Sequence, residues 1–442
     1  MENEPSSAFP TLEERKIVQR QILRDFWTGL AFAIVLVLAN LLFEHSPIGA
    51  QFEKWGDILF QRSLRATAMP DVVVLNIAAM DSSQNRFAAK YGENPRITSR
   101  ARLRELIGAV ASLSPRAIGV DVDMSPRYGG YADPNNDPAF FEWLLALRQA
   151  KHIPIYVGVY KATSLPTNSW LGVPQFKPLA ASAALFEEGD NRTIPATLGT
   201  ATDCGPSLSG ALTGFAVNCD RRSPFLTLVE PETRWHLGKY SGQEYVVNYS
   251  ALRDLQETAF DAPRGSAVEN EGSKIAGKAV LIGDTAPGYR ADVQDQCSVP
   301  INSGIPGVTG NTVPCVFVHA EGVFTLMQSP LYRLTPQARI FLDIVLAVVV
   351  LGAVSAVRWY YASRTRARVA TERLYNIGFI LFAIVILLAG GMLSRFTRVV
   401  WDDYILIVVV LLFHTRIERW LANAWRWLHA NIPKVVFEER TR

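Results

Sequence analysis

The chain has 442 residues, 49% of them hydrophobic, and a formal net charge of only +3 at pH 7. So small a charge argues against a nucleic-acid binder, which carries a concentrated basic face. The apolar content is high for a soluble protein and low for a pure transporter, so the composition indicates a globular domain joined to a few membrane spans.

The N-terminal region predicts a membrane anchor. Residues 1–25 are polar and charged, and residues 26–43 form an apolar segment of the length that a membrane-spanning helix needs. A cleaved signal peptide is the alternative. The long segment before the apolar run, and the absence of a small-x-small cleavage site after it, favour an uncleaved anchor.

A repeating strand-and-helix pattern follows the anchor. Residues 71–78 read DVVVLNIA, an apolar β-branched run typical of a strand that is buried on both faces. Ser99 can cap an amphipathic helix over residues 99–113, and residues 117–124 (AIGVDVDM) predict a second strand. This βαβ unit implies parallel strands joined by a right-handed crossover.

The rest of the large domain, which spans residues 44–336, continues the alternation. Residues 161–243 are rich in Pro, Gly, Ser and Thr and predict loops and short strands. The whole order predicts an α/β domain with a mostly parallel sheet covered by helices. Further helices are predicted at residues 134–150 and 320–328, and further strands at residues 153–160, 244–249, 279–283 and 315–319.

Three more apolar segments end the chain. They predict transmembrane helices at residues 337–357, 374–393 and 399–415. The last is interrupted by two aspartates, and a re-entrant or interfacial helix is the alternative there. Residues 416–442 carry an apolar helical stripe with arginines largely off it, which predicts an amphipathic helix on the membrane surface or, alternatively, a docking helix for an effector.

Arginine and lysine orient these four predicted spans. They concentrate in residues 1–25, in the loop at 358–373 and in the tail at 416–442. Basic segments mark the cytoplasmic side, and four spans place all three segments on one side. The domain at residues 44–336 is then exported, which in a bacterial inner membrane means that it lies in the periplasm.

The cysteines agree with that orientation. All four, Cys204, Cys219, Cys297 and Cys315, lie in the exported domain. An even number on the oxidising side predicts disulfides. The sequence leaves the pairing open, and we expect the neighbours Cys204–Cys219 and Cys297–Cys315 to pair. A zinc site is the alternative, but no CxxC spacing supports it.

Several segments together resemble a known family, the second type of the CHASE extracytoplasmic sensors. The layout of one span, a sensor domain and three further spans matches too. The resemblance implies a sensor that often dimerises. The segments that carry it are VVVLNIAAMD at 72–81, ITSRARLRELIGAVASLSPRAIGVDVDMS at 97–125, KAVLIGDTAPGYRAD at 278–292 and FVHAEGVFTLM at 317–327.

The chain also departs from that family's pattern. It has Ala78 and Ala79 where acids are usual before Asp81, and the turn in GDTAPGYRAD is longer by a residue. Family members usually continue past the last span into a kinase or cyclase, whereas only residues 414–442 follow here. We therefore expect the output domain to be a separate cytoplasmic protein.

Charged side chains gather where the predicted strands end. In open parallel α/β sheets, ligands bind at the carboxyl ends of the strands. These acids would make a pocket that favours an amine or a cation, although acids after strands also serve as turn formers and helix caps, and a lone buried histidine is often a core residue. The candidate ligand-binding residues are Asp81, Asp121, Asp123, Asp284, Arg290, Asp292 and His319.

No motif predicts catalysis. The sequence lacks GxSxG, HExxH, a P-loop and a GxGxxG after a strand, so we expect no enzyme, assign no catalytic or metal-binding residue, and name no cofactor. The resulting hypothesis is a multi-pass sensor of the bacterial inner membrane. It would bind an unknown periplasmic ligand and signal through its spans to a cytoplasmic effector. One alternative is a structural subunit of an envelope complex whose α/β domain binds a protein, and a third reading, an enzyme, has only the clustered carboxylates in its favour.

Overall fold

The computed structural model divides the chain into two compact units. The first, called here the sheet unit, consists of Asp57–Thr335 and Arg398–Val400, and the second consists of Met1–Gly56, Pro336–Thr397 and Trp401–Arg442. Apart from isolated positions before residue 68 and at 185, the residues that the structure describes are 68–80, 82–84, 96–126, 130–160, 169–183, 193–195, 197–198, 205–214, 225–228, 230–231, 243–285, 296–300, 312–362 and 368–400.

A parallel sheet forms the centre of the sheet unit. Within the described part of the chain it has six strands, and every neighbouring pair is parallel. The order across the sheet is β13 (Phe260–Asp261), β1 (Val72–Asn76), β14 (Ala279–Gly283), β4 (Ala117–Asp121), β5 (Ile155–Val159) and β6 (Ala180–Ser182).

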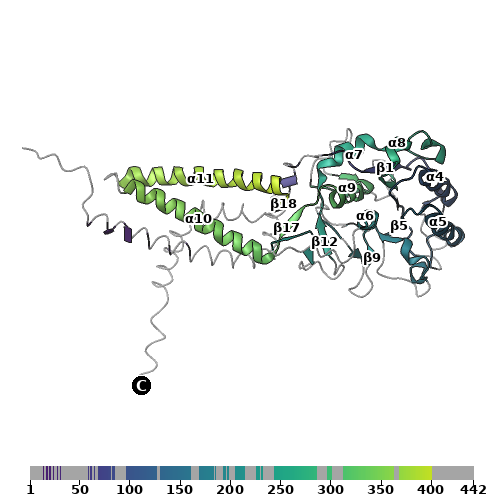
Figure 1. The fold of residues 1–442 in the computed structure, drawn as a ribbon, viewed down its shortest axis with the longest axis horizontal. Coiled ribbons are helices and arrows are strands. Elements are labelled where there is room, and N and C mark those ends of the chain that lie inside the picture. The colour runs from purple at the N-terminus through teal and green to yellow at the C-terminus, as the bar shows by residue number, and fades with distance from the viewer. Residues whose placement is uncertain are drawn as a thin grey trace, which may run out of the picture. The chain divides into compact units, whose positions relative to one another are not determined.

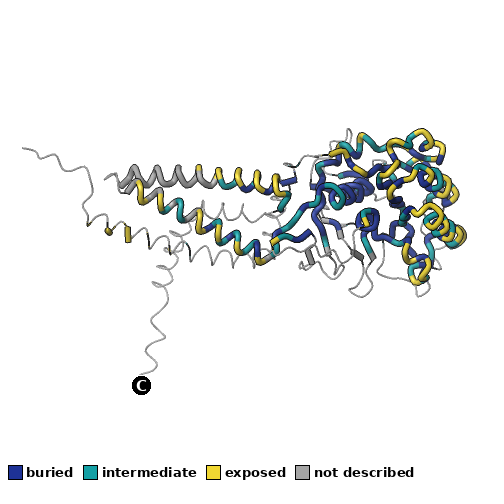
Figure 2. The backbone as a smooth tube through the Cα atoms, in the orientation of Figure 1, coloured by how far each residue is buried: buried dark blue, intermediate teal, exposed yellow. Residues whose placement is uncertain are grey.

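Helices cover both faces of this sheet. Successive side chains of a strand point to opposite faces, so Val72 and Val74 enter one core while Val73 and Leu75 enter the other. The result is a three-layer α/β/α arrangement (Figure 1), and the strands between the layers are buried (Figure 2). One layer contains α6 (Leu208–Thr213), α7 (Leu252–Thr258) and α9 (Cys315–Met327), and the other contains α4 (Arg100–Ser112), α5 (Asp137–Lys151) and α8 (Gly272–Ile275).

Short strands and 3-10 helices complete the described part of the sheet unit. The strands pair as β7 (Thr193–Pro195), β11 (Glu230–Pro231) and β12 (Gln243–Val246); β8 (Thr197–Leu198) and β9 (Gly205–Pro206); β15 (Gln296–Ser298) and β16 (Thr312–Pro314); β2 (Ser82–Gln84) and β3 (Arg96–Thr98); and β10 (Leu226–Thr227), β17 (Tyr332–Leu334) and β18 (Val399–Val400). The 3-10 helices are Trp170–Gly172, Lys177–Leu179, Tyr249–Ala251 and Gly265–Ala267.

The predicted α/β fold is confirmed, and much of its local structure with it. Ser99 caps α4, because its hydroxyl accepts a hydrogen bond from the backbone N–H of Arg102. The strand predicted at residues 279–283 has those same bounds in β14. The two strands of the first βαβ unit, β1 and β4, are not neighbours, because β14 lies between them and pairs with both.

Two segments differ from their predictions. Residues 315–319 were predicted to be a strand, but they form the first part of α9. The hydrophobic residues of this segment do not recur at helical spacing, because α9 is buried on every side from Cys315 to Thr325. The region at 161–243, predicted to hold only loops and short strands, contains the short helix α6, which begins after the cap residue Ser207.

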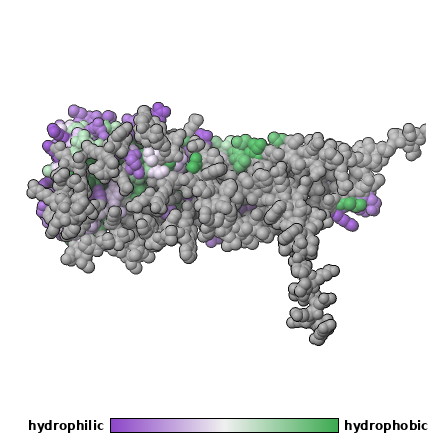
Figure 3. Space-filling view, turned by 180° about the vertical axis from the view of Figure 1, so that it is seen from behind, coloured by the Kyte–Doolittle hydropathy of each residue, from purple (hydrophilic) through white to green (hydrophobic). Residues whose placement is uncertain are grey.

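The described part of the second unit is a pair of long helices, α10 (Pro336–Ala362) and α11 (Arg368–Thr397), which contact each other. They contain the segments predicted as spans at 337–357 and 374–393, and both extend into the loop predicted at 358–373. Among the described residues, no helix has the combination of length and apolar character that a membrane span requires. Hydrophobic side chains gather on part of the surface in Figure 3.

The remaining membrane predictions fall largely outside the described residues. The segments 26–43 and 416–442 are not described, apart from two positions in the first. The fourth predicted span was expected to begin at residue 399. Val399 and Val400 instead form β18, which pairs in parallel with β17, and the rest of that predicted span lies outside the described residues.

Candidate functional site

The carboxyl ends of the parallel strands meet at one edge of the sheet, called here the carboxyl edge. Asn76, Gly283 and Asp121 end β1, β14 and β4, and they are partners in register across the three strands. Tyr160 directly follows β5, and Asp284 directly follows β14. Parallel pairing therefore brings polar side chains from distant parts of the sequence to one place.

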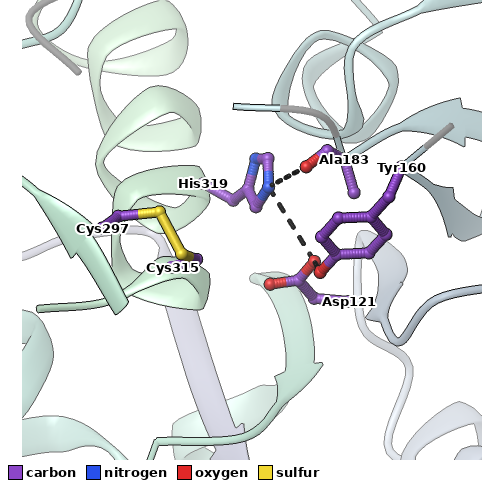
Figure 4. The surroundings of a disulfide bond; sticks show 6 residues. All are labelled: Asp121, Tyr160, Ala183, Cys297, Cys315 and His319. Carbon is purple, nitrogen blue, oxygen red and sulfur yellow. Dashed lines mark hydrogen bonds and ion pairs between the residues drawn. A yellow bond between two sulfur atoms is a disulfide. The ribbon is translucent and has the colours of Figure 1, made fainter. Parts of the chain in front are cut away.

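Asp121 is the buried acid of this edge. Its side chain lies at the end of β4, and the residue is only 4% exposed. The hydroxyl of Tyr160 donates a hydrogen bond to Asp121 Oδ1 at 2.5 Å (Figure 4). The tyrosine is itself held in place, because its backbone N–H donates to Ser125 Oγ at 2.9 Å.

His319 approaches the same acid from α9. It is fully buried, and its Nε2 lies 3.2 Å from the carbonyl oxygen of Ala183 and 3.8 Å from Asp121 Oδ1 (Figure 4). A carbonyl oxygen only accepts hydrogen bonds, so Nε2 carries the proton and donates it. The other ring nitrogen, Nδ1, has no hydrogen-bond partner among the described residues.

The electrostatics of the two groups follow from their burial. Desolvation disfavours the charged form of each group. Burial raises the pKa of Asp121 from 3.8 to about 7, although the hydrogen bond from Tyr160 lowers it. Burial lowers the pKa of His319 from 6.5 to about 4, although the hydrogen bond to Ala183 raises it. At neutral pH the imidazole is neutral, and the carboxyl group is partly ionised.

Two structural features bring α9 to the carboxyl edge. Gly283 has no side chain, and a Cβ atom there would lie 2.8 Å from Val316 Cγ2 and 3.2 Å from Asp121 Cβ. A disulfide between Cys297 of β15 and Cys315 fixes the first residue of α9, one helical turn before His319. This predicted disulfide is confirmed (Figure 4), whereas the predicted partners Cys204 and Cys219 lie outside the described residues.

The other predicted site residues do not all lie beside Asp121 and His319 in the described part of the chain. Asp123 lies beyond the end of β4, where its Oδ1 accepts a hydrogen bond from the backbone N–H of Ser125, a turn-forming contact. Asp284 is partly buried beside the carboxyl edge. The structure thus brings Asp121 and His319 together. Asp81, Arg290 and Asp292 lie outside the described residues.

Sequence reasoning missed two polar residues of this edge. Tyr160 is the last residue of the strand predicted at 153–160. The candidate acids were chosen because they lie at or just after strand ends, and Tyr160 meets the same criterion. Asn76 also ends a strand, and its side chain accepts hydrogen bonds from the backbone N–H groups of Ala78 and Thr285 and donates to Asp261. A search for any polar side chain at a strand end would have found both.

A third missed residue lies on α9. Glu321 is fully buried, and neither of its carboxylate oxygens has a hydrogen-bond partner among the described residues. Burial raises its pKa well above the usual value, and Asp254 of α7 adds to the rise. Burial therefore favours the neutral form of this carboxyl group. An acid inside the apolar run CVFVHAEGVFTLM was the signal in the sequence.

The chemistry that this edge offers is hydrogen bonding and proton exchange. In the described part of the chain, no group of three or more His, Cys, Asp and Glu side chains is arranged to hold a metal ion. The side chains that meet here are a carboxyl group, a phenol and an imidazole, which can bind a proton or a small polar molecule.

Comparison with known proteins matches residues 30–354 to the CHASE2 domain. The match covers the sheet unit up to Thr335 and residues 336–354 of α10. Neither the curated proteins nor the solved structures gave a match. CHASE2 domains are extracytoplasmic sensor domains of membrane proteins. Because the matched region is most of the chain, this protein belongs to the CHASE2 domain family.

Proposed function

We propose that this chain is an inner-membrane sensor whose periplasmic sheet unit binds a small amine or cation at the carboxyl edge. Binding would change the position of α9, and the change would pass through the spans to a separate cytoplasmic partner. The observation that carries the proposal is the placement of His319 beside Asp121, on a helix that leads within a few residues to α10. A ligand can transmit a signal only if its affinity differs between two arrangements of the protein.

The end of α9 supports this route because it is bonded to several distant segments. Gln328 follows the helix, and its side chain accepts a hydrogen bond from the backbone N–H of Asp71 and donates one to the carbonyl of Met69. The backbone carbonyl of Gln328 accepts a hydrogen bond from Arg398, which directly follows α11. A shift of α9 would therefore act on the segment before β1 and on Arg398, the residue that follows α11.

A second set of hydrogen bonds reaches the N-terminal side of the sheet unit. The backbone N–H of Asn248 donates to Thr325 Oγ1 of α9 at 2.8 Å, and its side chain donates to Ser329 Oγ at 2.7 Å. The side chain of Gln61 donates to the carbonyl of Val247 and accepts from the N–H of Tyr249. These buried polar contacts link α9 through residues 247–249 to Gln61, which comes after the predicted first span in the sequence.

Membrane anchoring is supported by hydropathy and by charge. The predicted spans are apolar, and the segments between and beyond them are rich in arginine. Large apolar side chains are also exposed in rows on both long helices, at the helical spacing of a continuous stripe. These are Phe341, Val345, Val348 and Val349 on α10, and Leu381, Ile384, Val385, Leu388, Met392 and Phe396 on α11.

The alternative function, an envelope scaffold, requires a broad apolar surface on the sheet unit for a protein partner. Among the described residues from Asp57 to Thr335, the large apolar side chains that are exposed are Met69 and Phe225. This favours a sensor over a scaffold.

The test is hydrogen exchange of the full chain in lipid nanodiscs, with and without putrescine, spermidine or Ca²⁺. We expect at least one of these probes to slow exchange at residues 279–285 and to change it at residues 315–335. The variant Asp284→Asn should lose the effect, and Glu142→Gln, which alters an exposed acid on α5, should retain it. No response to any probe, or an equal response in both variants, would contradict the proposal.

Orientation has its own test. A reporter fused after residue 442, and a second inserted at Arg366, should be inaccessible to a membrane-impermeant reagent added to intact cells, because both segments are expected in the cytoplasm. A reporter inserted in the sheet unit should be accessible. Accessibility of the C-terminal reporter in intact cells would exclude this topology.

A further inference from the structure

Among the residues that the structure describes, no arginine or lysine pairs with Asp121. Tyr160 donates one hydrogen bond to the carboxyl group, and in the described part of the chain the ionisable base nearest to it is His319, whose Nε2 lies 3.8 Å from Oδ1. That distance is too long for a hydrogen bond, and the imidazole already donates to Ala183. The charge of a carboxylate at this buried position is offset by few interactions, so the neutral acid is favoured.

The elements packed against this acid bring few charged side chains among the described residues. Asp284 follows β14, and the phenol of Tyr160 follows β5. α6 packs on β4 and has no titratable side chain. α9 brings His319, and its Glu321 is influenced by Asp254 of α7. Among the described residues, these elements therefore bring no cation toward Asp121, and the hydrogen bond from Tyr160 is what favours its ionised form.

We propose that the cluster of Asp121, Tyr160 and His319 is a proton-binding site, and that the proton is one stimulus that the sensor detects. This inference rests on the proposed function for the step from the site to the spans. In the proposed step, the Asp121 carboxyl group loses one proton to solvent as the external pH rises. Tyr160 keeps its hydroxyl proton, and His319 keeps the proton on Nε2.

The carboxylate that results has a polar neighbour on α9 to which it is not hydrogen-bonded. It attracts the Nε2–H group of His319, whose nitrogen lies 3.8 Å away and which donates its hydrogen bond to the carbonyl of Ala183. In a buried environment this attraction is stronger than it would be in water. Movement of the imidazole toward Asp121 turns or shifts α9, so protonation at the carboxyl edge is coupled to the helix that leads to α10.

The titration range fits a sensor of external pH. Burial raises the pKa of Asp121 to about 7 and lowers that of His319 to about 4. Near neutral pH the acid therefore changes its charge while the imidazole does not. The cluster responds as a single proton site in that range.

The experiment is infrared difference spectroscopy of the full chain in lipid nanodiscs as the pH is varied. We expect a protonated-carboxyl band that titrates with a midpoint near 7 and is absent from Asp121→Asn. Glu321→Gln, which removes another buried carboxyl group, should retain this band. A band that persists in Asp121→Asn, or a titration midpoint near the ordinary value of about 4 for aspartate, would overturn the proton site.

A second variant retains Asp121 and therefore tests the proton site even if Asp121→Asn does not fold. Tyr160→Phe removes the hydrogen bond that stabilises the carboxylate, so the midpoint should move to higher pH. An unchanged or lower midpoint would contradict the assignment of the band to this cluster.

Hydrogen exchange at residues 315–335 separates the two proposals. We expect the exchange there, corrected for the intrinsic effect of pH, to change across the same midpoint in the wild type and not in Asp121→Asn. Titration without a change in exchange would overturn the proton as a stimulus, while the response to amines or cations would remain a separate test of the proposed function. A response to pH without any response to those probes would leave the proton site standing and refute the amine or cation ligand.

Discussion

Burial acts in opposite directions on the two ionisable residues at the carboxyl edge. Asp121 has a pKa raised from 3.8 to about 7, so it stabilises the folded state most at low pH and loses this effect as the pH rises through 7. His319 has a pKa lowered from 6.5 to about 4, so its contribution is present above 6.5 and is lost as the pH falls through 4. Between these limits the two contributions offset each other.

Single substitutions should separate the two contributions. In His319→Gln, the free energy of unfolding should fall more steeply than in the wild type as the pH rises from about 4 to 7, because only Asp121 remains. In Asp121→Asn it should instead rise relative to the wild type over the same range. Urea denaturation at a series of pH values measures both slopes, and equal changes in the two variants would contradict this account.

A buried ion pair elsewhere has a structural role. Arg100 Nε donates to Asp137 Oδ1 at 2.6 Å, and this contact joins α4 to α5. Burial raises the pKa of Asp137, and Arg100 offsets part of that rise. We expect Asp137→Asn to lower the free energy of unfolding by about 3–5 kcal/mol, because the arginine is left as an uncompensated buried charge.

Chemical denaturation measures this loss. The matched control is Glu257→Gln, which removes one partner of an exposed ion pair on α7 and should leave stability unchanged. A similar loss in the control, or none in Asp137→Asn, would contradict a stabilising role for the pair.

At the scale of elements, α9 has the largest number of roles. Its N-terminal end is fixed by the disulfide, its middle carries His319, and its C-terminal end is bonded to distant segments. It is also the element that the sequence predicts least well. A helix without a polar face lacks the period that identifies helices, and the β-branched residues of CVFV favour a strand.

Removing the disulfide should free the start of this helix. The bridge closes a loop with a sequence separation of 18 residues, so Cys297→Ala with Cys315→Ala should lower stability by about 3 kcal/mol. Denaturation of the double variant tests the size of the effect, and faster hydrogen exchange at residues 315–319 tests its location. Unchanged exchange there would show that packing alone fixes the end of α9.

Close packing against α9 leads to a further prediction. A Cβ atom at Gly322 would lie 2.5 Å from the hydroxyl of Tyr245 and 2.9 Å from Ser209, so Gly322→Ala should cost about 1–3 kcal/mol. Gly108 of α4 has ordinary space, with Trp143 at 3.8 Å, and Gly108→Ala should be neutral or stabilising. Thermal unfolding compares the two variants, and equal effects would contradict the packing argument.

At the scale of the whole molecule, the order of strands in the parallel sheet is the feature that could not be predicted from the sequence. Each strand is a short apolar run with clear bounds, which is why β1, β4, β5 and β14 were found from local pattern alone. The pairing of β14 between β1 and β4 joins segments that are far apart in the sequence, and no local pattern encodes it. The site shares this limit, because Tyr160 and Asp121 become neighbours only through strand pairing.

Because β17 pairs with β18, residues 336–397 form an insertion whose two ends are adjacent in the sheet unit. The N–H of Tyr332 donates to the carbonyl of Arg398 at 2.9 Å, so the chain leaves and re-enters at adjacent points. A short glycine-rich linker from Thr335 to Arg398 can therefore replace both long helices without stretching the backbone. The excised protein, secreted from residue 57 onward, should form the Cys297–Cys315 bond and give a compact target for crystallisation; failure to form that bond would show that the insertion contributes to folding.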